Sequence, residues 1–207
     1  MPSSKENVGI LIGILSFFLF ASTDVAQKYA TIYHSVFQIM LFRYLFLLIL
    51  SLFESKRKNN PKFWKTKNLK IQVLRSFTSV LETAFFVTSF KYLHLADVHS
   101  VAALAPIIVV VLSIIFLKEF VDRKVWFAIF FGFIGVIIIL RPGFDVFSFK
   151  SLLPLGAAFF FGLYQILTKK VSETDSDETS LFFTSFGCCF LFWALSSFNK
   201  KSFRNRF

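Results

Sequence analysis

Seven long apolar runs dominate this chain of 207 residues and restrict the folds that are open to it. A helix needs about 20 consecutive, mostly apolar residues to cross the hydrocarbon core of a bilayer. The runs reach or approach this length once flanking Ser, Thr and Tyr residues are included. They cover residues 8–23, 36–53, 71–92, 98–117, 125–140, 152–167 and 181–198. We therefore predict an all-α membrane protein, a multi-spanning helical bundle of about seven transmembrane helices embedded in the lipid bilayer.

A soluble helical bundle is the alternative, because a helix at the centre of such a bundle can also be apolar all round. Seven such runs, however, leave almost no polar face to meet water. The chain is 56% hydrophobic and only 17% charged, whereas about a quarter of the residues in a soluble domain are charged. This composition excludes a disordered chain and argues against a soluble enzyme. We expect the first run to be retained, because no clear signal-peptide cleavage site follows it.

The positions of Lys and Arg predict the orientation in the membrane. Thirteen of them lie in the N-terminal tail and in the connections 54–70, 118–124 and 168–180, against four in the remaining connections. Cytoplasmic loops carry the excess of Lys and Arg, so we predict a multi-pass protein of the inner or plasma membrane with a cytoplasmic N-terminus. Nucleic-acid binding is disfavoured, because the basic residues border the apolar runs and no recognition motif accompanies them.

The C-terminal tail, residues 199–207, departs from this orientation scheme. It follows the seventh run, which places it outside, yet it carries four basic residues. Three explanations remain open: the tail is tolerated outside, the natural chain continues, or the last run does not insert fully.

A joint at Arg141-Pro142-Gly143 separates two segments that resemble each other. Gly13 and Gly156 each begin a Phe-rich stretch that ends in polar residues and lysine. Five runs precede the joint and two follow it, and an odd number of spans gives equivalent helices opposite orientations, as in the inverted repeats of many transporters. We predict one five-helix repeat at 8–143, the first two helices of an inverted second repeat at 150–198, and a basic tail at 199–207.

Several motifs within the first 143 residues carry a family resemblance. They are Asp24 to Lys28, Gln38, Phe42-Arg43, Leu74-Arg75, Ala102 to Pro106, Phe116 to Glu119, and Gly132 to Pro142 with Arg141. On these residues the chain resembles the EamA-type permeases of the drug/metabolite transporter superfamily. The resemblance implies ten spans in two repeats, a central cavity built from both, and transport of small metabolites such as amino acids and related compounds. The chain lacks counterparts of the last three spans.

Polar residues inside the runs are candidates for the cavity, because ionisable groups in a bilayer usually face a cavity or a partner. Arg43 lies deep in the second run, and we expect it to face the bundle. Glu82 is either a substrate-contacting or proton-coupling acid or a structural partner of Arg43 or Arg75. His99 is a proton-sensitive cavity candidate. Pro106 is expected to kink the fourth run, since it removes a backbone hydrogen bond.

Further charged residues have a structural and a functional interpretation. Asp24 and Lys28 share a helix face at a spacing of four and form either an interfacial ion pair or a charge pair at a cavity mouth. Arg75 lies seven residues before Glu82, on nearly the same face, or is simply a flank of the cytoplasmic end. Glu119 is expected to anchor the turn that follows the fourth run.

The sequence also bears on metals, cofactors and partners. His94, Asp97 and His99 lie at a helix boundary, where polar residues are common, so we predict no metal site. The adjacent Cys188 and Cys189 suit neither a disulfide framework nor a common zinc site, and no nucleotide-binding loop is present. Small-residue pairs, Gly9 with Gly13 and Gly132 with Gly135, permit close helix packing, within the chain rather than in a dimer.

Together these features predict a permease, not an enzyme, that moves a small organic solute by alternating access without a cofactor. The alternative is a truncated or half-size membrane protein without transport activity of its own. Such a protein acts as an inactive fragment or as an assembly partner, for instance as a homodimer or with a complementing half.

Overall fold

The computed structural model describes residues 4–59, 63–118, 120, 122–140 and 149–187, and its regular structure within these ranges is entirely helical. The helices are α1 (Ser4–Tyr33), α2 (Val36–Arg57), α3 (Leu69–Tyr92), α4 (Leu95–Ala102), α5 (Ala105–Leu117), α6 (Arg123–Leu140) and α7 (Leu152–Ser172), with a short 3-10 helix, η1 (Phe149–Ser151), before α7. Residues 177–187 are helical as well. The predicted all-α class is confirmed.

Four segments of the described chain are long and apolar enough to cross a membrane. They are Val8–Tyr33, Val36–Arg57, Leu95–Leu117 and Phe149–Ser172, which contain the first, second, fourth and sixth apolar runs. The third, fifth and seventh runs coincide with α3, α6 and the helix at 177–187, and the seventh continues beyond the described residues. The fold is thus a multi-pass helical membrane bundle, in which the total of seven spans stays a prediction.

The turn between α1 and α2 shows how the sequence sets the antiparallel arrangement. Ser35 precedes α2, and its hydroxyl accepts a hydrogen bond from the Gln38 amide at 3.3 Å. The Gln38 side chain in turn accepts one from the Ser35 amide at 3.1 Å. This reciprocal capping box satisfies backbone donors that would otherwise be unpaired at the helix start. It lets the chain reverse direction within two residues of the end of α1.

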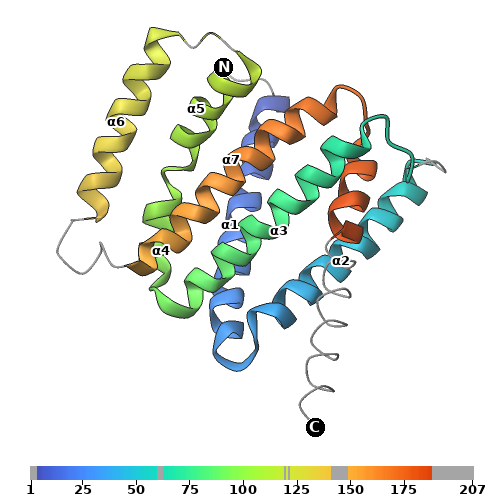
Figure 1. Ribbon diagram of the computed structural model, residues 1–207, viewed down its shortest axis with the longest axis horizontal. Helices are drawn as coiled ribbons and strands as arrows, with labels where there is room; N and C mark the ends of the chain where they lie inside the picture. The colour runs from blue at the N-terminus through green and yellow to red at the C-terminus, as the bar shows by residue number, and fades with distance from the viewer. Residues whose placement is uncertain (1–3, 60–62, 119, 121, 141–148, 188–207) are drawn as a thin grey trace.

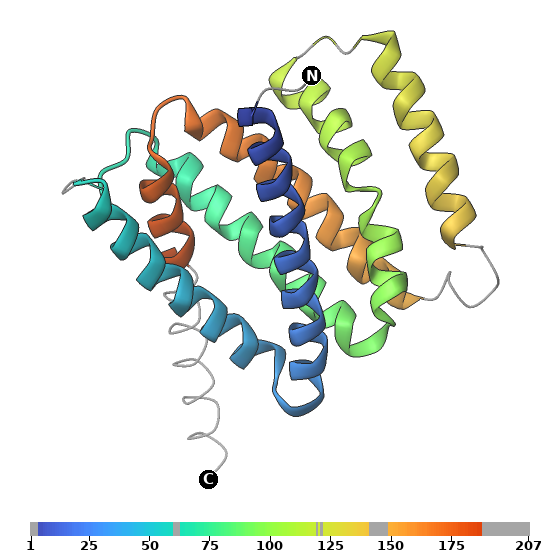
Figure 2. The same cartoon turned by 180° about the vertical axis from the view of Figure 1, so that it is seen from behind.

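Helix α3 is the least apolar of the long helices and lies in the middle of the bundle. It runs beside α7, with α1 behind it and α2 next to it (Figures 1 and 2). Its buried residues include Gln72, Arg75 and Thr83, alongside fully buried Val87 and Phe90. By contrast, large apolar side chains on the outer helices are exposed, for example Phe17 at 79% on α1. Polar residues inside and apolar residues outside are the arrangement that a lipid solvent favours.

The fourth apolar run forms two helices rather than one. Helix α4 ends at Ala102 and α5 begins at Ala105, with Pro106 in its first turn. A proline fits the first turn of a helix because the amide there has no intrahelical acceptor. Instead of the kink that we predicted at Pro106, the run breaks in the two residues before Ala105, and the proline removes no intrahelical hydrogen bond.

Glycines mediate close packing at a different place from the one predicted. Among the residues that the structure describes, a Cβ atom on Gly9, Gly13, Gly132 or Gly135 would meet nothing within 4 Å. Within this part of the chain the pairs therefore do not mediate close packing, contrary to the prediction. Gly162 of α7 instead lies against α5, where a Cβ would come within 2.9 Å of Leu112 and 3.0 Å of Ile108. This glycine lets α5 and α7 approach closely.

Candidate functional site

Three helices bring a chain of polar side chains together, from the buried Asp24 to the exposed Arg43. Asp24 of α1 is 2% exposed, and its Oδ2 atom lies 3.4 Å from Nε2 of His99 on α4. Its Oδ1 atom accepts a hydrogen bond at 3.5 Å from the Gln27 side chain. Gln27 in turn accepts one at 3.4 Å from Arg43 of α2. Arg43 is exposed rather than buried in the bundle as the sequence predicted, because its long side chain reaches Gln27 along the surface of the two helices. We call His99, Asp24, Gln27 and Arg43 the polar chain.

Glu82 of α3 lies close to this polar chain. Its charge interacts favourably with Arg43 and unfavourably with Asp24, and its Oε2 atom accepts a hydrogen bond from the Thr83 hydroxyl at 3.0 Å. Thr83 is itself held by Tyr44 of α2, whose hydroxyl lies 3.0 Å from the Thr83 hydroxyl. Of the two partners predicted for Glu82, the one near it is Arg43.

An aromatic surface borders the polar chain at His99. The rings of Phe86 and Phe90 on α3 lie edge to face, with centroids 4.8 Å apart. The centroid of the His99 ring lies 5.8 Å from that of the Phe86 ring and 6.2 Å from that of the Phe90 ring. The imidazole therefore has a buried carboxylate on one nitrogen and aromatic rings beside its face. The arrangement combines hydrogen-bonding groups with flat apolar surfaces, which is the usual make-up of a small-molecule site.

Lys28 does not form the predicted pair with Asp24. Its ammonium group donates hydrogen bonds to the Phe90 carbonyl and, at 2.8 Å, to the Leu93 carbonyl. Both carbonyls lie at the end of α3, where the last turn leaves acceptors unsatisfied and the helix dipole favours a cation. Lys28 thus caps α3, and Asp24 pairs with His99.

The sequence offered two interpretations of Arg75, a flank of the cytoplasmic end or a partner of Glu82. The structure supports neither. Arg75 is 2% exposed and lies at the other end of α3, where the acceptors that its guanidinium contacts among the described residues are neutral. Nη2 donates to the Ser180 carbonyl and to the Thr184 hydroxyl, the latter at 2.6 Å. Nη1 lies 3.4 Å from the Tyr164 hydroxyl, and the guanidinium lies over the Tyr164 ring. Arg75 therefore joins α3, α7 and the helix at 177–187.

The predicted site residues fall into two groups in the structure. Asp24, Arg43, Glu82 and His99 gather at one level of the bundle, and Pro106 lies beyond α4 on the helix that follows His99. Lys28 and Arg75 serve other contacts. Glu119, Arg141 and Pro142 lie outside the described residues. Among the residues that the structure describes, no three His, Cys, Asp or Glu side chains gather into a metal site.

Sequence reasoning missed several members of the site. Gln27 was visible as the residue three positions after Asp24, a spacing that places side chains on one helix face. Phe86 and Phe90 were not distinguishable from the other 30 of the 32 phenylalanines. Outside the site, Asp175 and Glu178 were also overlooked, although the four acids in the connection 168–180, on the lysine-rich side, were a usable signal.

Comparisons with known proteins agree with this architecture. A family model described as the EamA-like transporter family matches residues 7–141. A riboflavin transporter of Vibrio cholerae serotype O1 is 29% identical over 163 residues, covering 77% of this chain and 55% of that protein. An S-adenosylmethionine uptake transporter of Rickettsia bellii is 28% identical over 186 residues, covering 86% of this chain and 61% of that protein.

A second S-adenosylmethionine uptake transporter, from Rickettsia prowazekii, is 29% identical over 184 residues, covering 86% of this chain and 60% of its own length. The chain thus spans somewhat more than half the length of the curated relatives it matches. No solved structure matches the chain at a significant level.

Proposed function

Because this chain belongs to the EamA-like transporter family, we propose that it carries out transport of a small organic metabolite across the membrane by alternating access. The family is one of transporters, so no enzymatic activity is assigned to the chain. In this proposal the region 8–143 is a complete first repeat, 150–198 begins an inverted second repeat, and the N-terminus lies in the cytoplasm of an inner or plasma membrane.

The observation that carries the proposal is the buried Asp24 with His99 beside it. An ionisable pair inside a membrane bundle is costly and usually belongs to a solute or ion pathway. The pair is continued by Gln27 and Arg43 across α1 and α2. A solute that reaches this level can exchange hydrogen bonds with each of these groups, while the partly exposed Phe86 ring, which packs on fully buried Phe90, offers a surface for stacking.

The proposed solute class is a planar nitrogen heterocycle that carries a hydroxylated sugar-derived group. The relatives are named for riboflavin and S-adenosylmethionine, and these two molecules share that chemistry. The aromatic surface at His99 suits the flat ring, and the polar chain suits the hydroxyl and amino groups.

The test is uptake into proteoliposomes that contain the full chain, with labelled riboflavin, labelled S-adenosylmethionine and a panel of amino acids as solutes. We expect saturable uptake of at least one heterocyclic solute. Asp24→Asn should lower it by about tenfold or more, because a hydrogen bond to a charged group contributes about 1.5–3 kcal/mol. Phe17→Ala, on the exposed surface of α1, is the matched control and should leave uptake unchanged. Uptake that Asp24→Asn leaves intact would remove the polar chain from the pathway.

Proton coupling through Glu82 forms a second arm of the same experiment. Glu82→Gln keeps the shape of the side chain and its contact with Thr83 but cannot release a proton. If Glu82 couples protons, the variant should lose the dependence of uptake on an imposed pH gradient. A gradient dependence equal to that of the unaltered chain would exclude this role.

The second candidate function is that of an assembly partner without independent transport. The same uptake experiment tests this candidate. In that case uptake by the chain alone should be absent for every solute. It should appear only when the C-terminal part of a relative is co-expressed. The molecular mass of the detergent-solubilised protein would distinguish a homodimer from such a complex.

A further inference from the structure

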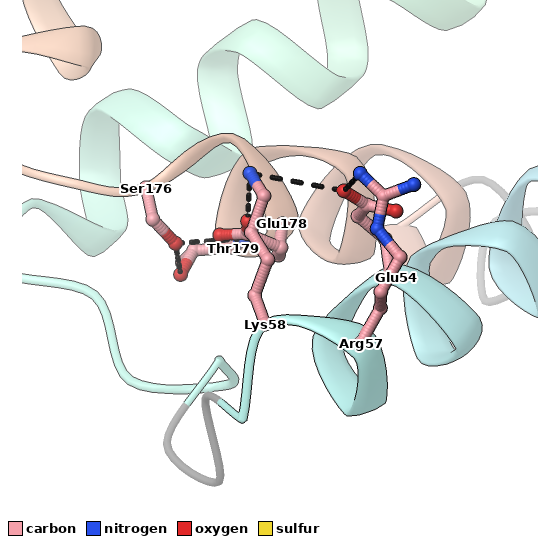
Figure 3. Close-up of polar contacts among 6 residues, drawn as sticks. All are labelled: Glu54, Arg57, Lys58, Ser176, Glu178 and Thr179. Atoms are coloured by element: carbon pink, nitrogen blue, oxygen red, sulfur yellow. Dashed lines mark hydrogen bonds and ion pairs between the residues drawn. The ribbon is translucent and has the colours of Figure 1, made fainter.

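The connection between α2 and α3 is fastened to the connection that follows α7. Lys58, at the end of α2, lies 2.5 Å from a carboxylate oxygen of Glu178, and the two side chains point toward each other in Figure 3. On the α2 side, the Oε1 atom of Glu54 lies 3.9 Å from the ammonium nitrogen of Lys58 and 3.0 Å from a guanidinium nitrogen of Arg57. The side chain of Glu178 is 3% exposed, against 47% for Lys58. A nearly buried carboxylate thus relies on a lysine from a distant segment.

Asp175 makes a second fastening close by. It accepts hydrogen bonds from the Thr66 hydroxyl, from the Lys67 amide at 3.1 Å and from the Gln72 side chain at 2.9 Å. All three donors lie in the α2–α3 connection or in the first turn of α3. Asn68 adds a bond to the Thr174 hydroxyl at 3.1 Å. The Phe63 ring packs edge to face on Phe182, with centroids 5.1 Å apart.

Arg75 extends these contacts toward the interior of the bundle. Gln72 accepts a hydrogen bond from Arg75 at 3.2 Å while donating to Asp175. Arg75 reaches in turn to Ser180 and Thr184 on the helix at 177–187. The charged and polar contacts are therefore layered, from the ion pair at the rim to a buried guanidinium.

Both acids are held in their charged form. The contact with Lys58, followed by a hydrogen bond from Ser176, lowers the pKa of Glu178 to about 2. Burial alone would raise the pKa of Asp175, but the hydrogen bonds from Thr66, Gln72 and Lys67 outweigh burial and hold it below its ordinary value. These contacts persist at physiological pH, so opening them requires movement rather than titration.

We propose that the Lys58–Glu178 ion pair and the Asp175 cluster with Thr66, Lys67 and Gln72 form a latch that closes this end of the bundle and opens during each transport cycle. The inference rests on the proposed function, in which α2 and α3 belong to one repeat while α7 and the helix at 177–187 belong to the other. Alternating access moves one repeat against the other, so contacts across this boundary must break. Charged rim contacts can exchange with water when they separate, which makes them suitable for repeated opening.

A thiol at position 76 reports on the latch without any solute. Ser76 of α3 is 4% exposed and is covered by the helix at 177–187, because a Cβ on Gly187 would lie 3.2 Å from the Ser76 Cβ. The experiment uses the full chain with Cys188→Ala, Cys189→Ala and Ser76→Cys, reconstituted in liposomes. The rate of reaction with a water-soluble maleimide then measures how often the two segments separate.

We expect Lys58→Glu to raise the reaction rate by about tenfold or more, because it replaces an attraction to a buried carboxylate with a repulsion. The double change Lys58→Glu with Glu178→Lys should return the rate to within a few-fold of the starting chain. Lys56→Glu, the same charge change at an exposed position of α2, is the matched control and should leave the rate unchanged. Lys58→Gln is the milder variant to use if Lys58→Glu does not fold.

The maleimide reaction rates of the variants show whether the latch exists. A rate that neither Lys58 variant changes would overturn the proposal, as would an increase that Lys56→Glu reproduces in full. Because the readout needs no solute, a chain that shows the expected rates but no uptake would keep the latch and reject independent transport. A chain that transports but shows unchanged rates would keep the proposed function and reject the latch.

Discussion

Glu178 shows how one residue can tie two distant parts of a membrane chain together. It precedes the seventh apolar run, so we expect it at the edge of the bilayer rather than within it. Its pKa is lowered to about 2 from the ordinary 4.5, chiefly by Lys58. A carboxyl group whose pKa is lower in the folded state stabilises that state above its unfolded pKa, and this contribution disappears as the pH falls through the folded value.

Glu178→Gln should therefore lower the melting temperature of the detergent-solubilised chain by a few degrees at pH 7. The difference in melting temperature between the unaltered chain and the variant should stay constant down to about pH 5. It should shrink between pH 4.5 and 2, where the carboxylate of Glu178 in the unaltered chain is protonated. Thermal unfolding followed by circular dichroism over this range measures it, and titration of other groups cancels in the difference. A difference that does not change with pH would mean that Glu178 is not held by charge.

At the same scale, the sequence identified polar residues better than it paired them. Asp24 and His99 were both candidates, but Asp24 was assigned to Lys28 because a spacing of four is visible along the chain. Contacts between helices are not visible in that way, since they depend on which faces meet. Lys28 donates to backbone carbonyls at the end of α3, and because every residue has a carbonyl, the sequence does not show which ones accept.

At the scale of elements, the helices themselves were largely predictable. Long apolar runs bounded by polar residues locate a membrane helix from length alone, and Pro106 marked the break in the fourth run. The ends were less predictable: α1 continues from the end of the first run at Thr23 to Tyr33. This polar extension carries Asp24 and Gln27, so the part of α1 that contributes to the site lies outside the apolar run.

Helix packing was the least predictable property of the elements, and Gly162 offers a test of it. Gly162→Val should destabilise the bundle by about 1–3 kcal/mol, the usual cost of overpacking, because the new side chain would meet Leu112 and Ile108 of α5. Gly132→Val is the matched control, since a Cβ there meets nothing within 4 Å, and it carries the same change in helix propensity. Melting temperatures in detergent compare the two. Equal losses would show that α5 and α7 do not depend on this close approach.

At the scale of the whole molecule, the chain is sorted by polarity in the opposite sense to a soluble bundle. Its most polar long helix, α3, is central, and exposed Phe, Leu and Ile side chains surround it. A bilayer supplies no hydrophobic force between apolar helices, so association relies on packing and on hydrogen bonds between helices. The contacts of Tyr44 with Ser79, of Gln72 with Ser180 and of Arg75 with Thr184 are bonds of this kind.

The orientation of the whole molecule is tested by two single cysteines in the Cys188→Ala, Cys189→Ala background. The turn after α1 and the connection 54–70 lie at opposite ends of α2, and the second of these carries seven of the 23 Lys and Arg residues. Basic loops stay in the cytoplasm. In intact cells an impermeant maleimide should therefore label His34→Cys, in the exposed turn, but reach Trp64→Cys, in the connection, only after lysis. Neither substitution removes a basic residue from the connection, so the signal that sets the orientation is preserved. The reverse labelling pattern would place the latch outside the cell and would contradict a cytoplasmic N-terminus, because α1 alone separates that terminus from the turn.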